Sequence, residues 1–127
     1  MTELIGIGTD LVEVNRVVRA YERFGERFLE RLYTAEERAY CMKRYDFGCA
    51  LAGRFAAKEA VVKALSPDAP VGLAYRDVAI HADGNRPRVE LGGAAAALAA
   101  RRGVVRVAVT ISHERAYAVA FAVAFGK

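Results

Sequence analysis

Tryptophan is absent from this 127-residue sequence, and there are only two cysteines and three prolines. Cys41 and Cys49 form no CxxC pair and have no neighbouring histidine, which argues against a disulfide framework and against a zinc site. No apolar run reaches the roughly 18 uncharged residues of a membrane span. The longest candidate, 104–125, is interrupted by Arg106 and by the polar stretch 113–115. The first residues do not show the basic segment followed by an apolar core that is typical of a signal peptide. We therefore expect no secretory signal, no membrane association, and free thiols in the cytoplasm.

The positive charge of the sequence is modest. Nineteen lysine and arginine residues stand against fifteen acidic residues, which leaves a net charge of +4, and lysine occurs at only four positions. This excess favours an anionic partner, but it is not the dense basic stripe of a nucleic-acid-binding protein. We therefore expect no nucleic-acid partner. Because 54% of the residues are hydrophobic, a chain of this length is expected to form a single domain over residues 1–127.

The hydrophobic pattern predicts an α+β fold with an antiparallel sheet packed on a long helix. Alternating apolar residues predict strands, and apolar residues at helical spacing predict helices. Thr34 and Glu37 make a capping box that marks the start of one helix. The expected strands are 4–11, 76–80, 88–91, 105–112 and 117–125, and the expected helices are 13–24, 28–33, 34–44, 48–65 and 94–101. Strands, helices and then strands in this order are typical of the α+β class.

The last two strands should pair as an antiparallel hairpin. In the second of them, alanines from 116 to 124 alternate with large residues, so that the two faces differ. The all-alanine face permits close packing against the long helix 48–65. The opposite face needs a second apolar layer, and it consists of Tyr117, Val119, Phe121, Val123 and Phe125.

Asp10 and Glu59 are acidic residues beside apolar segments, and each has two interpretations. Asp10 follows a strand and fits the N-cap pattern of the next helix, which is the favoured interpretation when Asp10 is taken alone. Glu59 shares a helix stripe with Leu51, Phe55 and Val62. A carboxylate at the edge of a core needs a partner. That partner is either Lys63 at i+4 or a hard cation, and the residues alone leave both open.

Histidine and arginine residues supply candidate anion contacts. His113 lies in the connection between the last two strands, where a histidine is usually solvated, although it can also hold a phosphate together with Arg115. Arg16, Arg19 and Arg23 follow an i, i+3, i+7 spacing and therefore share one face of the first helix. Such a face is normally only solvent-exposed, but it also suits docking of an acidic helix.

Three blocks together resemble the holo-acyl-carrier-protein synthase family, the small phosphopantetheinyl transferases. Residues 5–16 are similar to the family's opening strand, its aspartate and its arginine-bearing helix. Residues 53–65 contain the signature Gly-Arg-Phe-Ala-Ala-Lys-Glu-Ala, followed by Lys-Ala-Leu, and are similar to its signature helix. Residues 109–120 resemble its closing Ser-His hairpin. The blocks stand in the family's order and span nearly the whole chain.

The resemblance implies both a reaction and an assembly. The implied reaction moves 4′-phosphopantetheine from coenzyme A to a serine of an acidic apo acyl carrier protein and releases 3′,5′-ADP. The implied cofactor is Mg²⁺. The implied structure is the 4′-phosphopantetheinyl transferase fold as a homotrimer with active sites between subunits.

The resemblance also assigns roles residue by residue. Asp10 and Glu59 match the metal-binding carboxylates, and Lys63 matches a lysine near the diphosphate. Glu59, directly or through a metal-bound water, is then the best candidate to take the serine proton, and Lys63 would stabilise the charge of the leaving group. Arg54 and His113 match positions of the coenzyme A site, with His113 near the 3′-phosphate.

The remaining implied contacts lie in a turn and on the first helix. The family's Gly-Lys-Pro turn reads here as the segment 84–87, in which Arg86 and Pro87 are the expected nucleotide contacts. Arg16 matches a carrier-protein contact, and Arg19 and Arg23 extend it. The alternative is a noncatalytic small domain that binds coenzyme A, an anionic protein or a nucleic acid through its arginines. The Asp10 and Glu59 pair argues against a domain that binds only an anionic protein or a nucleic acid, because a pure anion binder gains nothing from two acids. A catalytically idle relative that binds coenzyme A is excluded only by an activity assay.

Overall fold

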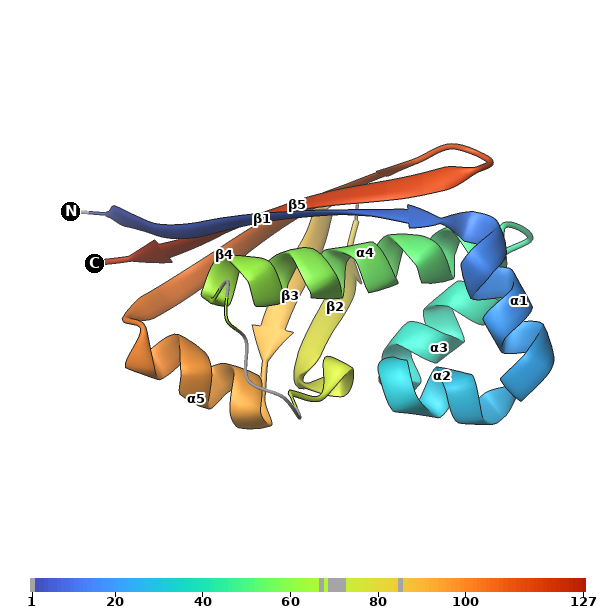
Figure 1. Cartoon of the computed structure of the whole chain (residues 1–127), viewed down its shortest axis with the longest axis horizontal. Helices are drawn as coiled ribbons and strands as arrows, with labels where there is room; N and C mark the ends of the chain where they lie inside the picture. The colour runs from blue at the N-terminus through green and yellow to red at the C-terminus, as the bar shows by residue number, and fades with distance from the viewer. Residues whose placement is uncertain (1, 67, 69–72, 85) are drawn as a thin grey trace.

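A computed structural model describes residues 2–66, 68, 73–84 and 86–127. The chain order confirms an α+β fold with antiparallel strands (Figure 1). The elements are β1 (Glu3–Glu13), α1 (Val14–Phe24), α2 (Glu26–Leu32), α3 (Ala35–Met42), α4 (Phe47–Leu65), the 3₁₀ turn η1 (Tyr75–Asp77), β2 (Val78–Asp83), β3 (Arg86–Leu91), α5 (Gly93–Arg101), β4 (Val104–His113) and β5 (Tyr117–Gly126).

The strands form two antiparallel sheets. In the three-stranded sheet β5 lies in the centre between β1 and β4, and β2 and β3 form a separate hairpin. Both hairpins predicted from the alternation are confirmed, β2 with β3 and β4 with β5. In Figure 1, α4 runs along the three-stranded sheet, while α1, α2 and α3 gather at one end of it. In the same view, α5 lies below α4, and the β2–β3 hairpin passes behind α4.

Small residues let the sheet approach α4 closely. The inward face of β5 consists of alanines 118, 120, 122 and 124, each no more than 1% exposed. On β1, a Cβ added to Gly6 would lie 2.0 Å from the carbonyl oxygen of Ala64, and one added to Gly8 would lie 2.0 Å from that of Ala60. Only glycine fits at these two positions, because the strand backbone lies directly against the helix backbone.

The opposite face of the three-stranded sheet is apolar and exposed. Ile7 and Leu11 on β1 are 69% and 66% exposed, and Phe121 on β5 is 55% exposed. The alternation predicted for β5 is therefore confirmed, with alanines inward and large side chains outward. Single chains rarely leave such a continuous apolar surface in water, so this face is a candidate interface.

The boundary between β1 and α1 differs from the prediction in a way that bears on function. Strand β1 continues to Glu13, two residues beyond the predicted end, and the N-cap of α1 is Glu13 without a side-chain hydrogen bond. The interpretation of Asp10 as an N-cap is therefore wrong. The capping box at α3 is confirmed, because Thr34 Oγ1 accepts from the Glu37 N–H and Glu37 Oε1 accepts from the Thr34 N–H. In the described part of the chain, no helix is long and apolar enough to cross a membrane.

Candidate active site

Asp10 and Glu59 reach the same cavity from different elements. Asp10 points inward from β1, and Glu59 lies on α4, which runs along that face of the sheet. Both residues line a cavity of about 320 Å³ together with Arg16 of α1 and Phe55 of α4. The two carboxylates are 49 positions apart in the sequence. The close approach of β1 to α4 therefore brings together the acidic residues that the resemblance assigned to the metal.

Lys63 pairs with Asp10. Its Nζ lies 3.2 Å from Asp10 Oδ1 and donates a second hydrogen bond, of 2.9 Å, to the carbonyl oxygen of Thr9. The side chain of Asp10 is only 19% exposed and that of Lys63 is 50% exposed. The i,i+4 pair between Glu59 and Lys63 that the helix spacing allowed is therefore not the one formed. Lys63 instead presents its charge beside Asp10, which lines the cavity.

Glu59 is held by a tyrosine that the sequence motifs did not indicate. The hydroxyl of Tyr75, in η1, donates a hydrogen bond to Glu59 Oε1. This hydrogen bond is the main reason that the pKa of Tyr75 is raised to about 12, and burial and the charges of Glu59 and Asp10 add to it. Both carboxylates therefore lie close enough to influence the same hydroxyl. Tyr75 follows the helix and stands outside any periodic pattern, so no spacing rule connects it to Glu59.

The carboxylates fit a magnesium ion that is shared with a substrate. Mg²⁺ binds oxygen, keeps several waters and usually takes only one or two carboxylates plus substrate phosphates. Asp10 and Glu59 supply two such carboxylates at the wall of a cavity. Across the described ranges, no group of three or more histidine, cysteine, aspartate or glutamate side chains could hold an ion by itself. The donor set therefore suits Mg²⁺ together with a phosphate ligand rather than a closed structural metal site.

Arg54 lies at a second cavity. It lines a hollow of about 270 Å³ with Tyr40 of α3 and with His81 and Arg88 of the β2–β3 hairpin. Its guanidinium carbon lies 4.3 Å from the centre of the Tyr40 ring. Its Nε is buried and has no hydrogen-bond partner among the described residues. A buried donor without a partner is costly, which sets this nitrogen apart from the other buried side-chain donors of the described residues.

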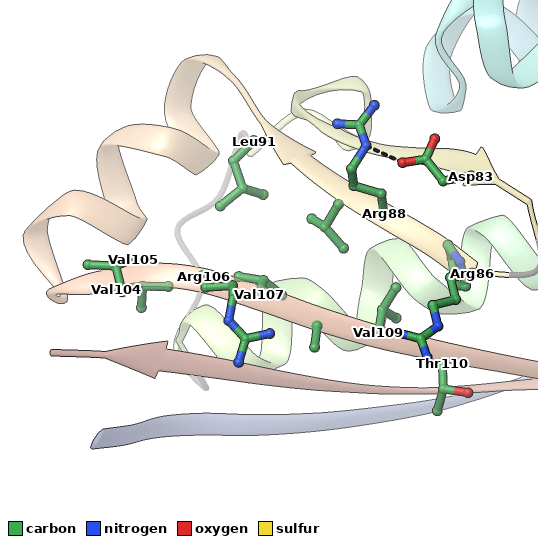
Figure 2. A pocket seen from close by; sticks show the side chains of 13 residues that line it. Asp83, Arg86, Arg88, Leu91, Val104, Val105, Arg106, Val107, Val109 and Thr110 are labelled. Atoms are coloured by element: carbon green, nitrogen blue, oxygen red, sulfur yellow. Dashed lines mark hydrogen bonds and ion pairs between the residues drawn. The ribbon is translucent and has the colours of Figure 1, made fainter. Parts of the chain in front are cut away.

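Arg86 and Pro87 lie at a third cavity, of about 930 Å³, between β3 and β4. Figure 2 shows Arg86 extending from β3 toward Thr110 on β4, while Arg88 turns to Asp83. The Arg88 Nε donates to Asp83 Oδ2 over 2.6 Å. The turn before Arg86 was predicted to pass through position 85, which lies outside the described residues.

His113 ends β4 at the exposed β4–β5 connection. It lies near the loop between α3 and α4, where Arg44 chiefly, and His113 to a smaller extent, lower the pKa of Asp46. None of the three cavities described above includes His113. Within one chain, Arg54 and Arg86 therefore line adjoining cavities that share Asp83 and Arg88, and His113 lines none of the three. Of the predicted coenzyme A contacts, Lys63 is the one that contacts Asp10.

The three predicted carrier-protein contacts lie on exposed positions of α1. Arg16 lines the cavity of Asp10 and Glu59. Arg19 forms a 3.3 Å ion pair with Glu13, and Arg23 lies over the ring of Phe24 at 5.1 Å. Phe24 is itself 55% exposed. This helix therefore offers positive charge and an apolar side chain directly beside the candidate active site.

Comparison with known proteins is consistent with this geometry. A family model described as the 4′-phosphopantetheinyl transferase superfamily matches residues 6–122. The holo-[acyl-carrier-protein] synthase of Desulforudis audaxviator is 48% identical over 124 residues, covering 97% of this chain and 94% of that protein. The crystal structure of the Neisseria meningitidis synthase aligns with a TM-score of 0.85 at 33% identity, covering 96% of this chain and 98% of that one. The Helicobacter pylori synthase, solved in complex with coenzyme A, aligns with a TM-score of 0.80 at 29% identity, covering 93% and 98%.

Proposed function

Because the chain belongs to the 4′-phosphopantetheinyl transferase superfamily, we propose that it is a holo-[acyl-carrier-protein] synthase. It transfers 4′-phosphopantetheine from coenzyme A to a serine of an apo acyl carrier protein. The observation that carries this function is the convergence of Asp10 and Glu59 on one cavity, with Lys63 paired to Asp10. Nearly full-length relatives that are named for this activity support it.

The reaction requires one bond to form and one to break at phosphorus. The serine oxygen attacks the phosphorus that carries the pantetheine group, and a new P–O bond forms. The bond from that phosphorus to the bridging oxygen of the diphosphate breaks, and the bridging oxygen leaves with 3′,5′-ADP. We assign the serine proton to Glu59, whose carboxylate lines the cavity, either directly or through a water molecule.

Asp10 and Glu59 would hold Mg²⁺ against the diphosphate. When bound, the ion supplies positive charge that neutralises the phosphate oxygens and stabilises the leaving group. Lys63 adds a fixed positive charge there, because its ammonium group is held by Asp10 and by the Thr9 carbonyl. Charge on the leaving oxygen grows as the bond breaks, so loss of Lys63 lowers kcat more than it raises the KM for coenzyme A.

A homotrimer with shared sites explains why the predicted contacts lie apart in one chain. The cavities lined by Arg54 and Arg86 do not include Asp10, and His113 lines none of the three, so a second subunit offers a way to bring all of them to one coenzyme A molecule. The exposed apolar face of the three-stranded sheet offers the surface for that assembly. A closed cyclic trimer uses such a face without leaving a free edge for further association.

The acidic carrier protein is expected to dock on α1. Arg16, Arg19 and Arg23 are exposed, and Arg16 borders the cavity where the serine must arrive. Surface arginines of this kind steer an oppositely charged partner and set its register. Docking there would place the carrier serine next to the diphosphate.

Intact-mass measurement tests the proposed function. Purified protein is incubated with coenzyme A, Mg²⁺ and an apo acyl carrier protein, and the carrier protein is then weighed by mass spectrometry. We expect the mass of one phosphopantetheinyl group to be added to each carrier, and none in a parallel sample containing a chelator. An unchanged carrier mass in the presence of Mg²⁺ would show that the chain lacks this activity.

A further inference from the structure

The two carboxylates of the candidate metal site have different orienting partners. Asp10 is held by the ammonium group of Lys63 at 3.2 Å. Glu59 accepts a hydrogen bond from the hydroxyl of Tyr75. Two carboxylates that line one cavity repel each other before a cation arrives. A donor on each of them keeps the oxygens from turning away from the shared position.

Tyr75 is held in place by the same helix that carries Glu59. Its ring packs on the ring of Phe55, with 5.6 Å between the ring centres. Its carbonyl oxygen accepts a 3.0 Å hydrogen bond from Lys58 Nζ. Phe55, Lys58 and Glu59 lie within about one turn of α4. Ring, carbonyl and hydroxyl of Tyr75 are thus all fixed relative to the Glu59 side chain.

Lys58 is a rigid anchor for this arrangement. Its side chain is fully buried and forms a 2.8 Å ion pair with Glu37, and it also donates to the carbonyl oxygen of Val78 over 2.6 Å. With the bond to Tyr75, all three N–H donors of the ammonium group are used. A buried charge that is satisfied in this way has no alternative partner to move to.

The far end of η1 is fixed as well. The side chain of Asp77 accepts a hydrogen bond from the Ala94 N–H over 3.2 Å, and its carbonyl accepts one from the Gly92 N–H over 2.8 Å. The turn is therefore anchored both to α4 and to the start of α5. Because the turn is held at both ends, the Tyr75 hydroxyl has a fixed position.

We propose that Tyr75 is a positioning residue for the metal site, and that its hydroxyl holds the carboxylate of Glu59 in the orientation that receives a divalent cation together with Asp10. The inference rests on the proposed function, because it takes Glu59 as a metal-binding residue. Groups that hydrogen-bond to metal-binding side chains typically change metal affinity by about 10–100-fold when they are removed.

The variant Tyr75→Phe isolates the hydroxyl, because it keeps the ring on Phe55 and the backbone bond to Lys58. The probe is Mn²⁺, titrated in the presence of coenzyme A and followed by electron paramagnetic resonance of the free ion. We expect the Mn²⁺ dissociation constant to rise about tenfold. We also expect the transfer rate to fall at low Mg²⁺ and to recover as Mg²⁺ is raised.

Tyr33→Phe is the matched control. It also removes one tyrosine hydroxyl, which donates a buried 2.9 Å hydrogen bond to the Leu51 carbonyl away from Glu59. Its melting temperature should fall while its Mn²⁺ affinity stays that of the wild type.

An Mn²⁺ affinity of Tyr75→Phe within about twofold of the wild type would overturn the inference. Equal weakening in Tyr33→Phe and Tyr75→Phe would overturn it too, because the effect would then be general loosening. If the wild type transfers phosphopantetheine normally while either of these results is found, only the proposed role of Tyr75 is refuted. A wild type that neither binds Mn²⁺ nor transfers would remove the proposed function together with this inference.

Discussion

Replacing Gly8 by alanine tests the close approach of β1 to α4, which brings Asp10 to the site. A Cβ at position 8 would lie 2.0 Å from the carbonyl oxygen of Ala60 and 2.9 Å from the backbone nitrogen of Ala64. Both atoms belong to the helix backbone, so neither can rotate out of the way. Strand and helix must therefore move apart.

The size of the effect follows from that distance. Ordinary van der Waals contact begins near 3.4 Å, so the new carbon lacks well over 1 Å of room. Overpacking a core typically costs about 1–3 kcal/mol, and we expect the upper end, about 3 kcal/mol, because rigid backbone lies on both sides. For a chain of this size, that lowers the melting temperature by about 10 °C. The transfer rate should fall as well, because Asp10 moves with the strand.

Thermal unfolding followed by circular dichroism checks this at one fixed protein concentration, because assembly would make the melting temperature depend on concentration. Gly92→Ala is the control, since its Cβ would meet no atom within 4 Å and its φ of −130° suits alanine. Because Gly92 is the N-cap of α5, where alanine is less favourable than glycine, this variant should lose about 1 kcal/mol at most, much less than Gly8→Ala. If Gly8→Ala melted within about 2 °C of the wild type, the tight strand–helix contact would be refuted.

Three further outcomes are expected. Burial raises the pKa of Cys41 from 9.0 to about 11, so between these pH values the folded state keeps a proton that the unfolded chain loses. The free energy of unfolding should therefore fall as the pH rises from 9 to 11, and it should fall less steeply in Cys41→Ala. Arg23→Glu, on the same face of α1 but outside the cavity of Asp10 and Glu59, should weaken binding of the carrier protein and leave coenzyme A binding unchanged in calorimetry, whereas lost coenzyme A affinity would refute the docking assignment. Light scattering at micromolar concentration should give three times the 13.8 kDa chain mass, and a monomer would contradict the shared-site assembly.

Much of the fold could be predicted because it rests on local pattern. From 117 to 125, alanine alternates with larger residues, which predicts a strand with small side chains on one face and large side chains on the other. Strand β5 has these two faces. The Thr34–Glu37 capping box depends on two side chains three residues apart, and it forms as predicted. Such features are specified within a few residues, so they can be recognised without knowledge of tertiary contacts.

The site was harder to predict because its contacts are long-range. The local pattern at Asp10 fits a helix cap, but pairing with β5 extends β1 to Glu13 and keeps Asp10 in the strand. Helix spacing allowed Lys63 to pair with Glu59, yet the nearby strand offers Asp10 and a free carbonyl instead. Tyr75 reaches Glu59 through tertiary packing alone, and no sequence spacing encodes that contact.

Phosphorus-31 nuclear magnetic resonance of a transfer reaction tests most directly the claim that this chain moves phosphopantetheine at the Asp10–Glu59 centre. Coenzyme A is mixed with apo acyl carrier protein and Mg²⁺, together with either the wild type or Asp10→Asn. For the wild type, the diphosphate signals should disappear while a phosphodiester signal on the carrier protein and the 5′-monoester signal of 3′,5′-ADP grow in equal amounts. The 3′-monoester is already present in coenzyme A, so its intensity should stay constant. With Asp10→Asn, the diphosphate should persist. Persisting diphosphate with the wild type, or normal turnover by Asp10→Asn, would contradict the account.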